Sequence, residues 1–134
     1  NEGYEESQGV ELQVAGSGDY KEGWNILKTK GFDNSNVSDD YEYFAFWFKG
    51  KTSKNKIGVW MYWGDNKGDK EIMLPEDSED GVWLYIKLSD WGITATEVTD
   101  FGVGYNNWDY KSYNLQFDNF MFIKNPEDLP NTTN

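Results

Sequence analysis

The sequence predicts an all-β fold, a jelly-roll β-sandwich of two antiparallel sheets. About eight segments alternate apolar and polar residues, turns rich in Gly, Asp and Asn separate them, and hardly any stretch has a helical period. With 134 residues, 18% of them aromatic, the chain suits one domain whose core is built largely from rings.

The first predicted strands are residues 10–15, 24–30 and 41–49, of which the last (YEYFAFWFK) has the strongest signal. Successive side chains of a strand point to opposite faces. One face of the strand at 41–49 therefore carries only phenylalanine, which favours burial. We assign these three residues to the core: Phe44, Phe46 and Phe48.

The next two strands form a predicted hairpin. Residues 56–63 (KIGVWMYW) place Ile57, Val59 and Met61 on one face, and this face is expected to be the core side. Residues 64–68 (GDNKG) are typical of a hairpin turn, and residues 69–74 form the returning strand. Trp60 and Tyr62 then lie on the outer face, where a fold does not need rings for its core.

The remaining elements follow an acidic turn at residues 75–81. Residues 82–88 alternate with Leu84, Ile86 and Leu88 inward, and residues 89–96 predict a short helical turn with Ser89 or Asp90 as N-cap. Two further strands are predicted at residues 99–105 and 112–123. The phenylalanines of the last strand are also assigned to the core: Phe117, Phe120 and Phe122.

Charge and composition exclude several classes of function. The net charge of −12 repels nucleic acid, anionic lipid and polyanionic substrates, and no apolar run is long enough to span a membrane. Without His or Cys there is no Ser-His-Asp triad, no Cys nucleophile and no conventional zinc site. Glycoside hydrolysis by two carboxylates survives as a reaction class, but no acidic motif supports it, so we expect no enzyme.

Three segments resemble one known family. They are YFAFWFKG at residues 43–50, WLYIKLSDW at residues 83–91 and LQFDNFMF at residues 115–122. Their order and spacing are similar to those of β-sandwich carbohydrate-binding modules, above all family 11 and related cellulosomal binders of β-glucan and hemicellulose. The resemblance covers residues 9–124, whereas residues 1–8 fit poorly to the strand with which the family usually begins. It implies the jelly-roll fold and a sugar-binding role.

The residues expected to bind carbohydrate are aromatic rings that stack on sugar faces, together with polar neighbours that bond hydroxyl groups. Trp60 and Tyr62 are the strongest candidates, because they oppose the core side of their strand. The structural alternative turns Trp60 into the sandwich and Val59 outward. The full candidate set is Trp60, Tyr62, Trp24, Trp63, Trp108, Tyr85, Lys87, Glu71 and Asn106.

No cofactor is required, but the resemblance implies a structural calcium ion held through Asp118. Glu11 is the conceivable second ligand. The alternative is equally strong: Asp118 sits in a β-bulge and bonds the backbone.

The sequence therefore predicts a non-catalytic carbohydrate-binding module over residues 1–124, followed by a linker-like tail at residues 125–134. Its expected ligand is a neutral β-linked plant polysaccharide: β-glucan, xyloglucan, glucomannan or cellulose. The resemblance implies a monomer that a bacterium secretes, for example as part of a cellulosome, and that targets an appended cell-wall hydrolase. A protein-interaction or adhesion sandwich is the main alternative, and a small glycoside hydrolase is the lesser one.

Overall fold

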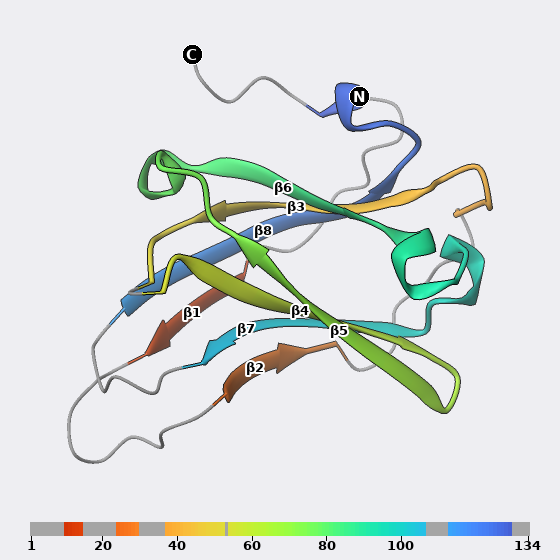
Figure 1. The fold of residues 1–134 in the computed structure, drawn as a ribbon, viewed down its shortest axis with the longest axis horizontal. Helices are drawn as coiled ribbons and strands as arrows, with labels where there is room; N and C mark the ends of the chain where they lie inside the picture. Colours follow the sequence, from red (N-terminus) through yellow and green to blue (C-terminus); the bar gives the residue numbers. More distant parts are fainter. Residues whose placement is uncertain (1–9, 15–23, 30–36, 53, 107–112, 130–134) are drawn as a thin grey trace.

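The structure is a computed structural model that describes residues 10–14, 24–29, 37–52, 54–106 and 113–129. Within these residues, strands form two four-stranded sheets that pack face to face (Figure 1). The strands are Val10–Val14 (β1), Trp24–Lys28 (β2), Tyr43–Lys49 (β3), Lys56–Trp63 (β4), Asn66–Met73 (β5), Val82–Lys87 (β6), Asp100–Asn106 (β7) and Tyr113–Ile123 (β8).

The strand orders are β1-β8-β3-β6 and β2-β7-β4-β5, with every neighbouring pair antiparallel. Apart from the β4–β5 hairpin, each strand is followed in sequence by a strand of the other sheet. This arrangement is a jelly roll. It confirms the fold class that the strand pattern predicted.

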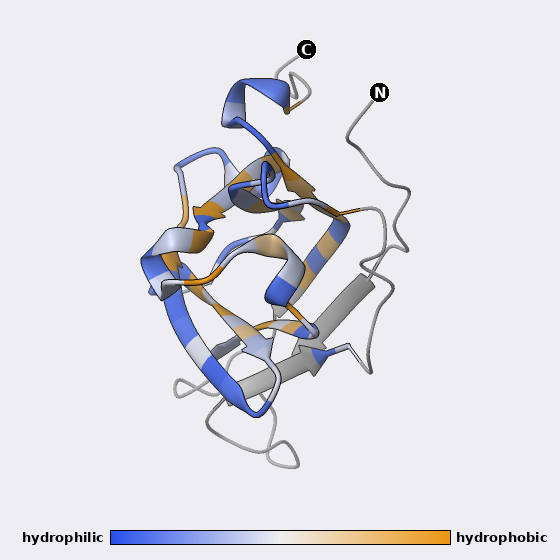
Figure 2. Ribbon diagram, turned by 90° about the vertical axis from the view of Figure 1, so that its right-hand side faces the viewer, coloured by the Kyte–Doolittle hydropathy of each residue, from blue (hydrophilic) through white to orange (hydrophobic). Residues whose placement is uncertain are grey.

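The core lies between the sheets and consists largely of rings, as predicted. Its fully buried side chains include Phe44, Phe46 and Phe48 of β3, facing Val59 and Met61 of β4. The same alternation is visible as blue and orange stripes along the strands in Figure 2. The alternative that turned Val59 outward is wrong, because its side chain has no exposed surface.

A β-bulge in β8 lets Phe117 and Phe120 both reach the core although they are an odd number of residues apart. Ala45 pairs with Met121 and Trp47 pairs with Asp118, so β8 has one extra residue between these two pairs. Asn119 takes up the extra length with φ 55°, in the left-handed region that Asn tolerates better than most residues. The bulge therefore resets the alternation of β8.

Most predicted strand ends lie within two residues of the observed ones, but two turns differ more. The hairpin loop is only Gly64 and Asp65, because Trp63 already pairs with Asn66. The helical turn at 89–96 is two 3-10 turns, Leu88–Trp91 (η2) and Ala95–Glu97 (η3). Ser89 and Asp90 lie inside η2 and do not cap it; only η3 has a capping box, made by Thr94 and Glu97.

The segment after β8 folds back on the outer face of the β1-β8-β3-β6 sheet. Asn125 caps a 3-10 turn, Pro126–Asp128 (η4), by accepting a hydrogen bond from the Glu127 amide. Leu129 then packs against a small cluster of buried side chains: Ala45, Met121 and Ile123. No helix of the described residues is long and apolar enough to cross a membrane.

Candidate functional site

The outer face of the β2-β7-β4-β5 sheet carries the aromatic side chains of β4 that the core does not use. Ile57, Val59 and Met61 point into the sandwich, so Trp60 and Tyr62 point outward. The outward positions whose side chains the structure describes define what we call the Trp60 face: Lys28, Lys56, Gly58, Trp60, Tyr62, Lys67, Asp69, Glu71, Met73, Asp100, Gly102 and Gly104.

Three positions without side chains adjoin the two rings. In the register of β4 and β7, Gly58 pairs with Gly104 and Trp60 pairs with Gly102. The Trp60 side chain is only 8% exposed. Tyr62 is more exposed, because it is only partly buried. Trp60 is therefore no open platform in this conformation, and Tyr62 is the ring on this face that a ligand reaches more easily.

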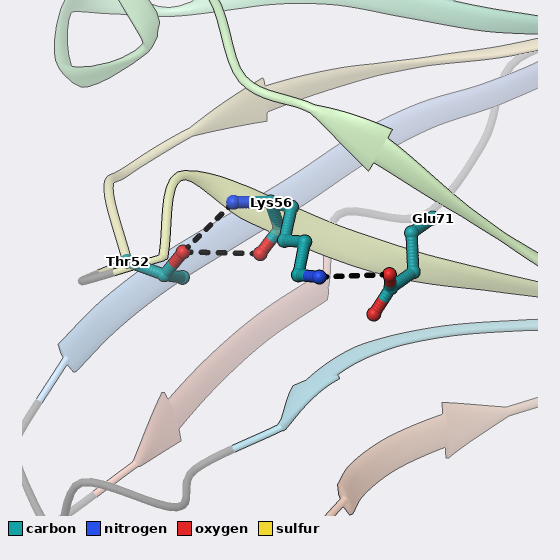
Figure 3. A network of polar contacts seen from close by, with 3 residues as sticks. All are labelled: Thr52, Lys56 and Glu71. Atoms are coloured by element: carbon teal, nitrogen blue, oxygen red, sulfur yellow. Dashed lines mark hydrogen bonds and ion pairs between the residues drawn. The ribbon is translucent and has the colours of Figure 1, made fainter.

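An ion pair orders one end of the Trp60 face. Lys56 Nζ donates to Glu71 Oε1 at 3.0 Å across the β4–β5 pair. Thr52 fixes the backbone of the same lysine, because its hydroxyl accepts from the Lys56 amide at 3.1 Å and donates to the Lys56 carbonyl at 3.0 Å (Figure 3). The Glu71 carboxylate is thus held at a defined position at the surface.

A second cation orders the other end. Lys28 of β2 places Nζ 4.3 Å from the centroid of the Tyr62 ring, a cation–π contact. Next to it, Thr29 Oγ1 donates to Asp100 Oδ1 at 2.7 Å. The register puts Asp100 opposite Tyr62, so this carboxylate lies beside the ring.

The edge strand β5 contributes a row of exposed polar groups. Lys67, Asp69 and Glu71 occupy alternate positions and are exposed, and Met73, 66% exposed, ends the row. Alternate residues of a strand are roughly 6.8 Å apart, so these groups form a spaced line of donors and acceptors beside the aromatic positions of β4. Such a line suits a ligand with many hydroxyl groups.

Tyr85 and Lys87 lie on the opposite side of the molecule. Both belong to β6 and occupy the outer face of the β1-β8-β3-β6 sheet. Tyr85 is 47% exposed and makes an edge contact with Tyr43, with ring centroids 5.8 Å apart. The structure therefore does not bring these two predicted residues together with Trp60 and Tyr62.

Trp63 is also separate from the Trp60 face. Its side chain lies on the same side of β4 as that of Met61. It packs against the core at the end of the sandwich, where it adjoins Gly68 and Trp91. Trp24 and Asn106 are register partners in the β2–β7 pair, and their side chains lie outside the described part of the structure. Trp108 lies outside it altogether.

Of the two suggested calcium ligands, only Asp118 has a side chain that the structure describes. Asp118 Oδ1 accepts a hydrogen bond from the Asn119 amide at 2.7 Å, as the bulge alternative predicted. No group of three or more acidic side chains that could hold a metal ion occurs among the described residues. Glu11 pairs with Gln116 in the backbone register, and its side chain is outside the description. The calcium site expected at Asp118 and Glu11 therefore stays a prediction.

Several residues of the Trp60 face were not predicted. Lys28, Asp69 and Asp100 come from three strands and meet around Trp60 and Tyr62 only through the sheet order. One signal was available: FGVGY at residues 101–105 alternates Gly with larger apolar residues, which indicates a strand with one nearly bare face.

Comparison with known proteins gives a likeness to a solved structure. No family model matches the chain, and no curated protein sequence matches it. A family 11 carbohydrate-binding module from Clostridium thermocellum, solved in complex with a β-1,3-1,4-mixed-linked tetrasaccharide, superposes with a TM-score of 0.48 and 12% identity. The match covers 89% of this chain and 84% of that one. At 12% identity few side chains are shared, so function must be inferred from the residues of the site itself.

Proposed function

We propose that this protein is a carbohydrate-binding module whose Trp60 face binds a neutral, β-linked polysaccharide. The observation that carries the proposal is a partly accessible ring, Tyr62, beside a line of exposed polar groups on β5. A ring packs against the apolar face of a sugar, and the polar groups exchange hydrogen bonds with its hydroxyl groups. The largely buried Trp60 ring lies beside Tyr62, beneath the proposed ligand.

The charge of the face favours a neutral ligand. Its described residues include three lysines (28, 56 and 67) and three carboxylates (Asp69, Glu71 and Asp100), so the face is balanced although the chain carries −12. A neutral sugar carries no charge on which the field of the protein can act, whereas a polyanion approaching from solution is repelled by the net negative charge of the molecule. The ligand class is therefore neutral glucan or hemicellulose, without uronic acids.

Two of the three described carboxylates of the face are engaged in ways that suit binding better than hydrolysis. Glu71 is paired with Lys56, and Asp100 accepts from Thr29. A glycosidase needs one carboxyl group as a proton donor and a second as base or nucleophile. We therefore propose that the protein holds its ligand and does not cleave it.

We further propose that the binding serves to target a linked, secreted plant-cell-wall hydrolase. Holding the substrate beside a tethered catalytic domain raises its effective concentration. Leu129 packs on the sandwich, so the proposed tether starts after it, in the Pro-, Asn- and Thr-containing sequence of residues 130–134. Hydrolysis of insoluble cell wall by such an enzyme should fall when Tyr62 is replaced by Ala, while hydrolysis of a short soluble substrate should not.

Affinity electrophoresis tests the binding itself. The gel contains β-glucan, xyloglucan, glucomannan or xylan, with polygalacturonate as the polyanion. We expect at least one neutral polysaccharide to retard the protein and polygalacturonate not to. Tyr62→Ala should remove the retardation, since stacking of one ring contributes about 1–2 kcal/mol, or roughly 5- to 30-fold in affinity.

Tyr85→Ala is the matched control, because it removes a more exposed tyrosine from the other sheet. Loss of binding with Tyr85→Ala and not with Tyr62→Ala would show that the site lies on the β1-β8-β3-β6 sheet and not on the Trp60 face. No retardation by any polysaccharide would refute the function, and capture of a protein partner would then support the adhesion alternative. Release of reducing sugar by the purified protein would establish a hydrolase.

A further inference from the structure

Among the described residues of its sheet, Tyr62 has few side-chain neighbours on β7. Its partner on β7 is Asp100, which is engaged with Thr29, and the next outward position on β7 is Gly102, which has no side chain. A tyrosine with open space on one side can change rotamer, and ordering it on binding reduces affinity. Something must fill that space if the ring is to be ready for a ligand.

Lys28 fills it from two strands away. Lys28 pairs with Gly102 in the β2–β7 register, while Tyr62 belongs to β4 on the other side of β7. Strands two apart in a sheet are separated by roughly 9.5 Å, a distance that a lysine side chain spans only if the position between them is bare. Gly102 is bare, and Lys28 Nζ reaches a point 4.3 Å from the centre of the Tyr62 ring.

We propose, on the basis of the function proposed above, that Lys28 is a positioning residue for carbohydrate binding. Its ammonium group covers the side of the Tyr62 ring that looks toward β7, holds the ring in one orientation and leaves the other side for the sugar. The ligand then packs on the side of Tyr62 toward β5, where Lys67 is the register partner of Tyr62 and Asp69 and Glu71 follow. The polysaccharide chain is thereby directed along the β4–β5 hairpin and kept off β2.

The alternative role of Lys28 is a competitor that a sugar must displace from the ring. The two roles predict opposite effects of removing the ammonium group. A positioning residue gives weaker binding when it is lost, and a competitor gives tighter binding. The alternatives can therefore be separated by the direction of one affinity change.

The test is Lys28→Met, which keeps most of the apolar stem and removes the charge. Isothermal titration is done with the neutral polysaccharide that retards the wild-type protein. We expect about 3- to 10-fold weaker binding, the range for ordering one side chain. Lys28→Arg should restore most of the affinity, because a guanidinium group makes the same contact with a ring. In a Tyr62→Ala background, Lys28→Met should have no further effect.

Lys124→Met is the matched control. Lys124 also lies over a tyrosine, with Nζ 5.8 Å from the centroid of Tyr41, and it is not part of the Trp60 face. Its loss changes net charge by the same amount and should leave affinity unchanged. If the two substitutions changed the affinity equally, or if Lys28→Met bound the polysaccharide more tightly, the positioning role would be overturned. The proposed carbohydrate-binding function would not be affected by that result.

A second readout does not need a ligand. The ring protons of Tyr62 should shift in the NMR spectrum of Lys28→Met, and those of Tyr41 should not. If no polysaccharide binds but this shift is seen, the proposed function fails although the contact is real. If the shift is absent, Lys28 does not hold the ring and the positioning role is refuted whatever the affinity.

Discussion

Gly68 lies where the inward side of β5 meets two indole rings. It pairs with Met61, whose side chain is fully buried, and a Cβ atom built on Gly68 would lie 2.6 Å from Trp91 Cδ1 and 3.2 Å from Trp63 Cη2. Normal contact between carbon atoms is about 3.5–4.0 Å, so Trp91 would have to move by roughly 1 Å. Both rings pack against the core, which limits where they can go.

We therefore expect Gly68→Ala to lower the free energy of unfolding by about 1–3 kcal/mol, the usual effect of adding a methyl group to a packed interior. Urea denaturation followed by tryptophan fluorescence measures the change, and the native emission spectrum should shift as well. Trp91→Phe provides a check on the mechanism. It should cost less stability in the Gly68→Ala background than in the wild type, because the smaller ring relieves the clash.

A stability of Gly68→Ala within about 0.5 kcal/mol of the wild type would refute the reasoning, since it would mean that the rings have room to move. Additive effects of Gly68→Ala and Trp91→Phe would show that the clash is not with Trp91.

Three further predictions concern other parts of the fold. Asn119→Val should lower the unfolding free energy by about 1–2 kcal/mol, since a β-branched residue tolerates a φ of 55° poorly, whereas Asn119→Gly should be nearly neutral in the same urea titration. Leu129→Ala should lower the melting temperature and increase binding of a hydrophobic dye, because it uncovers the cluster around Met121; an unchanged melting temperature would show that the segment after β8 contributes nothing to stability. The hydrogen bond from Thr96 Oγ1, at 2.6 Å, lowers the pKa of Asp39 below its ordinary 3.8, so the bond stabilises the fold above that pH and the effect is lost as pH falls through the lowered pKa. An NMR titration in which Thr96→Val leaves the Asp39 pKa unmoved would contradict this.

Much of the fold was accessible from the sequence because alternation is a local property. The parity of Phe44 to Phe48 and of Ile57 to Met61 predicted the core sides of β3 and β4 correctly. The hairpin was also recognised, although its loop is shorter than the Gly spacing suggested. Capping of η2 was predicted wrongly, since Ser89 and Asp90 offered cap chemistry while the turn begins one residue before Ser89.

The candidate site was accessible only in part. Parity shows which side of its own strand a ring occupies, and this was enough to place Trp60 and Tyr62 outside the core. It does not show which of two sheets a strand joins, so Tyr85 and Lys87 were grouped with residues from the opposite face of the sandwich. It also does not show depth, and Trp60 is far less exposed than its outward position suggested.

The sequence by itself determined the all-β class, the ring-built core and the acidic character that favours neutral ligands, because these depend on composition and on a period of two. Tertiary structure alone decided that Lys28, Tyr62 and the polar row of β5 share one face. The physical reason is that a jelly roll pairs strands that are distant in sequence. In this sheet β7 lies between β2 and β4, and Gly102 of β7 has no side chain, so Lys28 of β2 can contact Tyr62 of β4.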